Sequence, residues 1–228
     1  MIVPELLGTA SIPGGGELKL LQRVGSNGAT DFMIVLGGNE LMNSRMCGSE
    51  EALAEMTITR LGVRPDLHML IGGYGMGFTL RKALALLGPE ARVTVAELVP
   101  EILDWARGPM AALTGDGLED RRVQIAHGDV GFLISGGEGR YDAILLDIDN
   151  GPDGLVRDEN NRIYSKTGLG EARAALKPGG VLAIWSAAPD PAFTNRLRRA
   201  RFDVEEVVVR ARENGKGPRH VIWFARRG

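Results

Sequence analysis

Cysteine, histidine and aromatic residues are scarce in this chain of 228 residues. The single cysteine, Cys47, cannot form an internal disulfide, which predicts a protein of a reducing compartment. The three histidines, His68, His127 and His220, lack the spacing of metal ligands, so we predict no metal site. No serine lies in a nucleophile elbow, and Cys47 has no histidine near it in sequence, which argues against covalent hydrolysis.

Long hydrophobic runs and an excess of one charge are also missing. No apolar stretch approaches the roughly 20 residues that cross a bilayer, and the first residues lack the basic start and apolar run of a signal peptide. The formal net charge is −2, and the arginines within 195–201 are not interleaved with aromatic residues that could stack on bases. We therefore expect a cytoplasmic protein that binds neither membranes nor nucleic acid.

What the chain does contain, from about residue 61, is an alternation of short apolar runs with helical segments, which predicts a parallel sheet covered on both faces. The predicted strands are 68–71, 92–96, 122–126, 143–146 and 181–185, and the predicted helices are 78–87, 100–113 and 165–176. The last two strands, 204–211 and 220–225, are joined by a loop too short for a crossover helix, so they form an antiparallel hairpin.

Residues 1–60 follow a different pattern. Strands at 18–24 and 32–36, separated by a turn at 25–28, predict a small antiparallel β cap. A helix then begins at Ser49, with acidic residues in its first turn. We therefore predict a β cap with one helix in residues 1–60 and a larger α/β domain in residues 61–228, doubly wound around a mostly parallel seven-stranded sheet.

A glycine-rich loop follows the first strand of the larger domain. Glycines at 73, 75 and 77 allow a sharp turn and let a ligand approach the backbone closely, although a tight strand-to-helix turn alone also explains them. The second strand ends in Glu97, about 20 residues beyond this loop, where a carboxylate can accept both ribose hydroxyls of a nucleoside. A carboxylate that starts the next helix is the alternative.

Two cofactors compete for this loop. A dinucleotide fingerprint requires glycine three residues after its second glycine, and Phe78 occupies that position. The parallel sheet with a terminal hairpin resembles class I methyltransferase folds, which favours S-adenosylmethionine over a nicotinamide cofactor. In those enzymes an acidic residue at the end of the third strand contacts adenine. Asp129 holds that position, or it caps the next helix through Phe132.

The order of cap, glycine loop, Leu80-Arg81 and aspartate loop resembles the spermidine synthases, the polyamine aminopropyltransferases, over nearly the whole chain. That family shows Gly-Gly-Gly-Asp-Gly-Gly-x-x-Arg-Glu after its first strand, and the matching stretch here begins Gly73-Tyr74-Gly75-Met76-Gly77. The resemblance implies that Tyr74 and the three glycines hold the cofactor. Met76 replaces the family's aspartate, which binds the ammonium of decarboxylated S-adenosylmethionine, so ordinary S-adenosylmethionine fits at least as well.

The resemblance also implies acceptor-side residues. Spermidine synthases read Asp-Ser-Ser-Asp after the fourth strand; here Asp147 aligns with their catalytic aspartate, and Asp149 stands in for the second. Glu51 keeps the carboxylate of their Tyr-His-Glu gate, and Tyr164 takes an aromatic position of the acceptor pocket unless it packs in the core. The cap of these synthases builds a dimer, so a homodimer is implied, while the sequence leaves the oligomeric state open.

The predicted chemistry is transfer from S-adenosylmethionine or its decarboxylated form to a small-molecule acceptor. Asp147 can hold the ammonium of an amine acceptor and take its proton, provided that burial or a neighbouring charge such as Asp149 raises its pKa. The sequence slightly favours methyl transfer to a small polar or cationic acceptor over aminopropyl transfer to a polyamine. A non-catalytic nucleoside-binding protein and a nicotinamide oxidoreductase are the alternatives.

Overall fold

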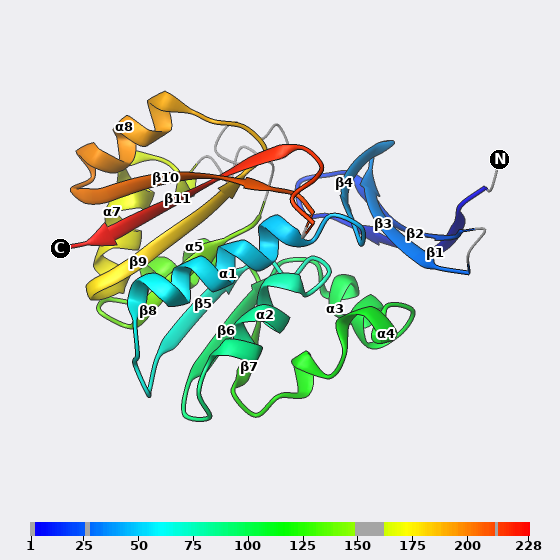
Figure 1. The fold of residues 1–228 in the computed structure, drawn as a ribbon, viewed down its shortest axis with the longest axis horizontal. Helices are drawn as coiled ribbons and strands as arrows, with labels where there is room; N and C mark the ends of the chain where they lie inside the picture. The colour runs from blue at the N-terminus through cyan, green and yellow to red at the C-terminus, as the bar shows by residue number, and fades with distance from the viewer. Residues whose placement is uncertain (1–2, 26–27, 149–161, 213) are drawn as a thin grey trace.

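The described part of the chain, residues 3–25, 28–148, 162–212 and 214–228 of a computed structural model, forms two sheets (Figure 1). The smaller sheet is antiparallel, in the order β1-β2-β3-β4. Its strands are β1 (Glu5–Ser11), β2 (Glu17–Val24), β3 (Thr30–Leu36) and β4 (Asn39–Asn43). The sequence predicted β2 and β3 but missed the two outer strands.

The larger sheet has seven strands in the order β10-β11-β9-β8-β5-β6-β7. Its strands are β5 (His68–Gly72), β6 (Arg92–Glu97), β7 (Val123–His127), β8 (Tyr141–Leu146), β9 (Leu176–Ser186), β10 (Phe202–Arg210) and β11 (Arg219–Arg227). Strands β5 to β9 run parallel, and β11 pairs antiparallel with both β9 and β10. The predicted doubly wound fold with a terminal hairpin is confirmed. The strand order reverses between β5 and β8, where open α/β sheets bind ligands.

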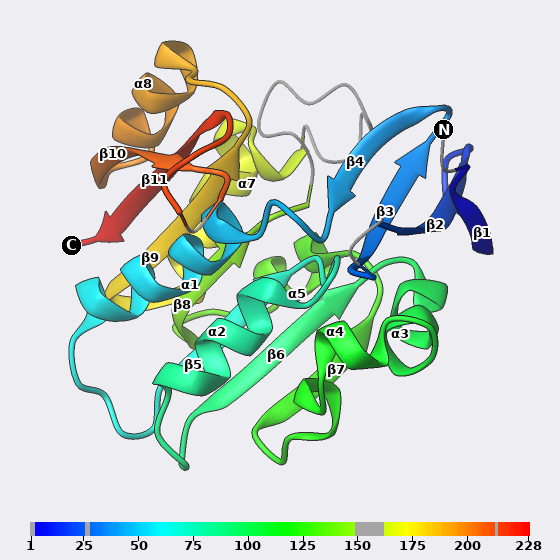
Figure 2. The same ribbon diagram turned by 45° about the vertical axis from the view of Figure 1, so that its right-hand side comes forward.

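Helices cover both faces of the larger sheet (Figures 1 and 2). Their bounds are α1 (Gly48–Leu61), α2 (Phe78–Leu86), α3 (Pro100–Arg107), α4 (Ala111–Thr114), α5 (Val130–Ser135), α7 (Lys166–Ala175) and α8 (Pro191–Arg199), with a 3-10 turn at Gly117–Glu119. Side chains of β8 alternate between two cores: Ala143 and Leu145 pack with α1 and α2, while Ile144 and Leu146 pack with α5, α7 and α8. Within the described ranges, no helix is long and apolar enough to span a membrane.

Two predicted boundaries are wrong. The single helix predicted at 100–113 is interrupted after Arg107, because Pro109 has no N–H to donate and disfavours helical backbone at Gly108, and α4 begins only at Ala111. Residues 177–180, between the predicted helix 165–176 and the predicted strand 181–185, lie inside β9, which begins at Leu176, directly after α7 ends. A register shift between Tyr141 and Ala143 on neighbouring β8 accommodates this early start.

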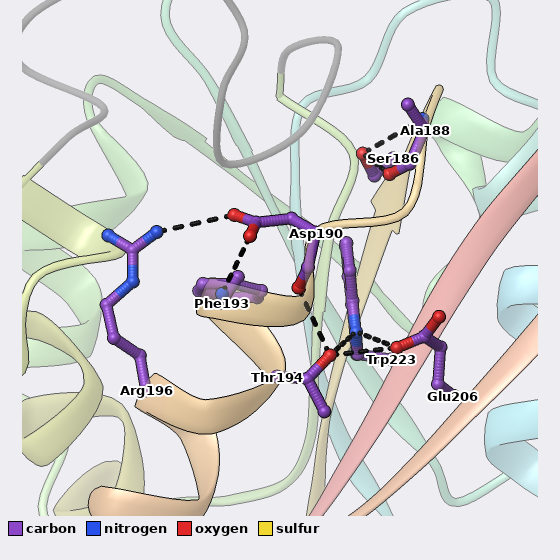
Figure 3. A network of polar contacts seen from close by, with 8 residues as sticks. All are labelled: Ser186, Ala188, Asp190, Phe193, Thr194, Arg196, Glu206 and Trp223. Atoms are coloured by element: carbon purple, nitrogen blue, oxygen red, sulfur yellow. Dashed lines mark hydrogen bonds and ion pairs between the residues drawn. The ribbon is translucent and has the colours of Figure 1, made fainter.

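A polar network attaches α8 to the C-terminal hairpin (Figure 3). The carboxylate of Asp190 caps α8 by accepting a hydrogen bond from the Phe193 N–H at 2.9 Å. The buried indole of Trp223 donates to the Thr194 hydroxyl at 2.8 Å, and that hydroxyl donates to Glu206 at 2.8 Å. The network satisfies a polar atom inside the second core and fixes the far edge of the sheet.

An ion cluster around the buried Asp142 fixes the start of β8. Asp142 accepts hydrogen bonds from Arg64 at 2.7 Å, Lys177 at 2.6 Å and the His68 N–H at 2.9 Å. Burial alone would raise the pKa of Asp142, but the His68 N–H and the two cations outweigh burial and lower it. Asp142 lies at the start of β8 and Asp147 just beyond its end, so the two acids lie at opposite edges of the sheet.

Removing this carboxylate should destabilise the fold. We expect Asp142→Ala to lower the free energy of unfolding by about 2–4 kcal/mol, because His68 N–H and two cations lose their partner. The lowered pKa means that Asp142 stabilises the protein above its unfolded pKa and loses that effect as pH falls through the folded value. Urea unfolding at several pH values measures both effects. Exposed Asp66→Ala is the control, and equal stability of the two variants would contradict the role assigned to Asp142.

Candidate functional site

The ends of the parallel strands face the small sheet (Figure 2). Residues of both line a cavity of about 160 Å³. The polar side chains and exposed backbone of its wall come from the segments that follow β5, β6, β7 and β8: Gly73, Gly75, Glu97, Gly128, Asp129 and Asp147. The facing wall comes from the small sheet and is apolar: Ile12, Leu18, Ile34, Leu36, Leu41 and Met42. The cavity therefore combines a hydrophobic cover with a few converging polar groups, as ligand sites do.

The glycine loop brings bare backbone to this cavity. Gly73, Gly75 and Gly77 have φ angles of +86°, +57° and +77°, which L side chains rarely adopt. A Cβ atom on Gly73 would lie 2.6 Å from the carbonyl oxygen of Asp147, and one on Gly75 would lie 2.9 Å from Cε of Met42. Of the described loop residues, Gly73 and Gly75 line the cavity, whereas Tyr74 and Gly77 pack against each other behind it.

Glu97 ends β6 and is only 5% exposed. One carboxylate oxygen accepts the Tyr74 N–H at 2.8 Å, and the other accepts the Val99 N–H at 2.9 Å. Burial raises the pKa of Glu97, and these N–H donors oppose the rise. Each oxygen keeps a further lone pair for a ligand hydroxyl. The carboxylate therefore binds the backbone just before α3, whose N-cap has no side-chain hydrogen bond, and it lines the cavity where ribose binding is predicted.

Asp129, like Glu97, both binds the protein backbone and lines the cavity. It is the N-cap residue of α5, and its carboxylate accepts the Gly131 N–H at 2.7 Å, not the Phe132 N–H. It also lines the cavity. The capping interpretation is thus observed, and contact with adenine stays a prediction.

Asp147 follows β8 and lines the cavity beside Gly73. Burial, reinforced by the charge of Glu50, raises its pKa to about 8. Burial also raises the pKa of Glu50 to about 7, against the opposing hydrogen bond from Ser49. Asp149, predicted to supply the like charge, lies outside the described residues. The acid that does so is Glu50, which sequence reasoning missed although it directly precedes Glu51.

Three other sequence candidates lie away from the cavity lining. Glu51 is bound to Arg81 at 3.0 Å and Lys82 at 3.2 Å, so it joins α1 to α2. Tyr164 is 2% exposed and packs edge-to-face on Phe193 in the second core, as its core-packing alternative proposed. Met76, the residue that departs from the glycine-loop motif described above, is buried in the first core. Among the residues that the structure describes, no group of three or more His, Cys, Asp or Glu could hold a metal.

No protein-family model matches the chain, but individual relatives do. A polyamine aminopropyltransferase of Corynebacterium efficiens is 34% identical over 123 residues, covering 53% of this chain and 22% of that protein. Spermidine synthase 2 of Arabidopsis thaliana is 26% identical over 194 residues, covering 84% of this chain and 52% of that protein. A solved spermidine synthase in complex with the transition-state analogue AdoDATO superposes with a TM-score of 0.74 at 18% identity, covering 98% of this chain and 72% of the other.

The fold and these relatives define the class: a Rossmann-like α/β protein of the methyltransferase type. Within that class, the resemblance to spermidine synthases is confirmed. A more distant relationship is also present, since ribosomal RNA small subunit methyltransferase H of Shewanella pealeana is 30% identical over 174 residues, covering 74% of this chain and 49% of that protein. The chain spans about half or less of the length of the curated relatives cited here.

Nucleoside binding should depend on Glu97. Replacing Glu97 with glutamine removes the charge and places an amide N–H₂ opposite one of the two backbone N–H donors. We therefore expect the affinity for S-adenosylmethionine or its decarboxylated form to fall at least tenfold, which corresponds to about 1.4 kcal/mol. Calorimetric titration measures it. Glu90→Gln, on an exposed side chain, should bind like the wild type. Unchanged affinity in Glu97→Gln would show that the carboxylate does not contact the nucleoside.

Proposed function

We propose that the chain is a transferase of the spermidine synthase group that moves an aminopropyl group from decarboxylated S-adenosylmethionine to a small amine. One observation carries the proposal: a single cavity gathers the glycine backbone, Glu97 and Asp147, in a chain whose relatives include polyamine aminopropyltransferases. The homodimer implied by the resemblance is part of the same proposal.

The residues of the cavity fit a nucleoside with a sulfonium end. Glu97 is placed to accept the sugar hydroxyls, and Asp129 would contact the adenine amino group. The bare backbone at Gly73 and Gly75 lines the cavity, where it would let the donor lie close to the sheet. When bound, the donor supplies a carbon made electrophilic by the positive sulfur.

Asp147 is suited to prepare an amine acceptor. Alkyl ammonium groups have pKa values near that of lysine, about 10.4, so at neutral pH the acceptor nitrogen needs a base. An ordinary aspartate, with a pKa of about 3.9, is a weak base for this task. Burial and the Glu50 charge raise the pKa of Asp147 to about 8, which brings it much closer to the acceptor's. Its carboxylate holds the ammonium, takes the proton and leaves the nitrogen lone pair aligned for attack.

Methyl transfer from S-adenosylmethionine is the second candidate. Met76 replaces the aspartate that in spermidine synthases binds the ammonium of the decarboxylated donor, so the preference for that donor is lost. A methyltransferase is also among the relatives. The sequence patterns slightly favour this reaction, but the named relatives favour aminopropyl transfer, and we therefore place it first. Binding of the nucleoside without any turnover would instead support the non-catalytic alternative.

The proposed base predicts a pH-dependent rate. Asp147 must be ionised to act, so kcat/KM should rise with pH up to about 8 and then level off on this limb. Asp147→Asn should lower kcat/KM by about 100-fold or more, while exposed Asp116→Asn should not change it. Mass spectrometry of products from each donor with 1,4-diaminobutane measures the reaction. A methylated product formed only from S-adenosylmethionine would overturn the aminopropyl proposal.

A further inference from the structure

The end of the molecule farthest from the small sheet carries a group of arginines. Figure 1 shows the C-terminus and α8 at this end and the small sheet at the other. The group, called the arginine face below, consists of Arg140, Arg173, Arg198, Arg199 and Arg201. Four of these side chains are exposed, and that of Arg173 is half-buried. We propose that the arginine face binds the phosphodiester backbone of a single-stranded nucleic acid without reading its sequence.

Hydrogen bonds bring the segments of the arginine face together at the end of α7. The Arg140 N–H donates to the carbonyl oxygen of Ala175, the last residue of α7, at 2.9 Å. Nε of Arg173 donates to the carbonyl oxygen of Arg201 at 3.2 Å. The other two arginines end α8, shortly before Arg201. The sequence places only the arginines of 195–201 together, and the fold adds Arg140 and Arg173 to them.

The positive charge of the arginine face is not balanced nearby. Within residues 3–25, 28–148, 162–212 and 214–228, none of its five members forms an ion pair. Two acids of the adjoining segments have basic neighbours of their own. Glu171 on α7 is paired with Arg162 at 3.8 Å. Asp203 lies opposite Arg226 in the β10–β11 pairing, on the face of the sheet away from α8, because side chains alternate along β10 and its first residue packs in the second core.

Arg201 is held in a backbone conformation that suits glycine. Its φ angle is +66°, the one positive value at a non-glycine residue in the described part of the chain. It follows α8 at the position where helices commonly end on a left-handed glycine, and its N–H donates to the Arg198 carbonyl oxygen at 2.9 Å. The helix dipole explains cations in the last turn of α8, but it does not require a side chain at this strained position. Such strain is typical of residues whose side chains have a function.

A phosphodiester strand fits the arginine face better than a protein or a membrane. Guanidinium groups bind phosphate oxygens through paired hydrogen bonds. Protein interfaces and membrane-bound helices bury large apolar side chains, whereas the segments 138–140, 173–176 and 198–201, all of them described, expose none. These segments also contain no aromatic residue that could stack on a base. Contacts would therefore be made to phosphates alone, which carry no sequence information.

Salt dependence of binding tests the proposal. Fluorescence anisotropy of a labelled oligouridylate of about 15 nucleotides should give a Kd of about 10 µM at about 50 mM KCl. If all five arginines contact phosphates, the logarithm of the affinity should fall with the logarithm of the salt concentration with a slope of about −3.5. Oligothymidylate of the same length distinguishes RNA from DNA as the preferred strand. Failure of both strands to bind, or binding that does not weaken with salt, overturns the proposal.

The variant Arg201→Gly separates binding from folding. Glycine suits the backbone conformation, so the melting temperature should be at least that of the wild type. The same variant removes one phosphate contact, so the affinity for oligouridylate at about 50 mM KCl should fall about eightfold and the salt slope should decrease by about 0.7. Arg201→Lys keeps the charge and should keep the slope. Arg212→Gly is the matched control, because it removes an exposed arginine beyond the other end of β10. Equal affinities of the two glycine variants would contradict the proposal.

Charge reversal at the end of α8 extends this test. Arg198→Glu combined with Arg199→Glu should lower the affinity by about sixtyfold or more, as the loss of two phosphate contacts at this salt concentration implies. Phosphatidylserine vesicles and polyglutamate are the competing probes, since they carry negative charge without a nucleic-acid strand. Tighter binding of either probe than of both oligonucleotides would assign the face to a membrane or to an acidic protein, and would overturn the proposal.

This inference does not depend on the function proposed above. The arginine face and the small sheet that covers the cavity lie at opposite ends of the molecule (Figure 1). Arg201→Gly should therefore bind methylthioadenosine with the affinity of the wild type, which calorimetry measures. A protein that binds the oligonucleotide through these arginines but transfers no group from either donor would refute the proposed function and leave this inference standing.

Discussion

The arrangement of the cavity depends on one buried carboxylate. Glu97 joins two backbone segments, since its oxygens accept the N–H groups of Tyr74 in the glycine loop and Val99 at the start of α3. A charge at this depth is tolerated because backbone dipoles stabilise it. With the two loops fixed, the small sheet can pack over them at positions without side chains, where Met42 contacts Gly75 and Trp105 contacts Gly8.

Four other acids fall into two groups by their partners. Asp142 and Glu51 each bind two cations, so their charges are balanced within the protein and they serve the fold. Asp147 at the cavity and Glu50 in α1 instead have raised pKa values, because burial disfavours the charged state of both. A raised pKa, rather than burial alone, therefore identifies the acid beside which a bound cation would be favourable.

Sequence patterns predicted the elements whose side chains alternate between two cores, and missed features decided by tertiary contact. The apolar runs of β5, β6 and β8 are unambiguous because both faces are covered. β1 and β4 are short and half-exposed, and only their partners in the small sheet define them. The choice between Glu50 and Glu51 could not be made either. Neighbouring helical residues differ by about 100° in direction, and only packing shows that Glu51 binds the cations of α2 while Glu50 accepts from Ser49.

The raised pKa of Asp147 answers a charge problem that the proposed reaction creates. Donor and acceptor are both cationic, and two cations in one half-buried cavity repel each other strongly. Permanent carboxylates would balance them, but would also leave unpaired buried charges whenever the cavity was free. A protonated Asp147 avoids that cost, because its pKa of about 8 keeps the carboxyl neutral near pH 7 until the ammonium arrives. When the acceptor gives its proton to Asp147, one positive and one negative charge disappear together, and the nitrogen is left neutral beside the donor.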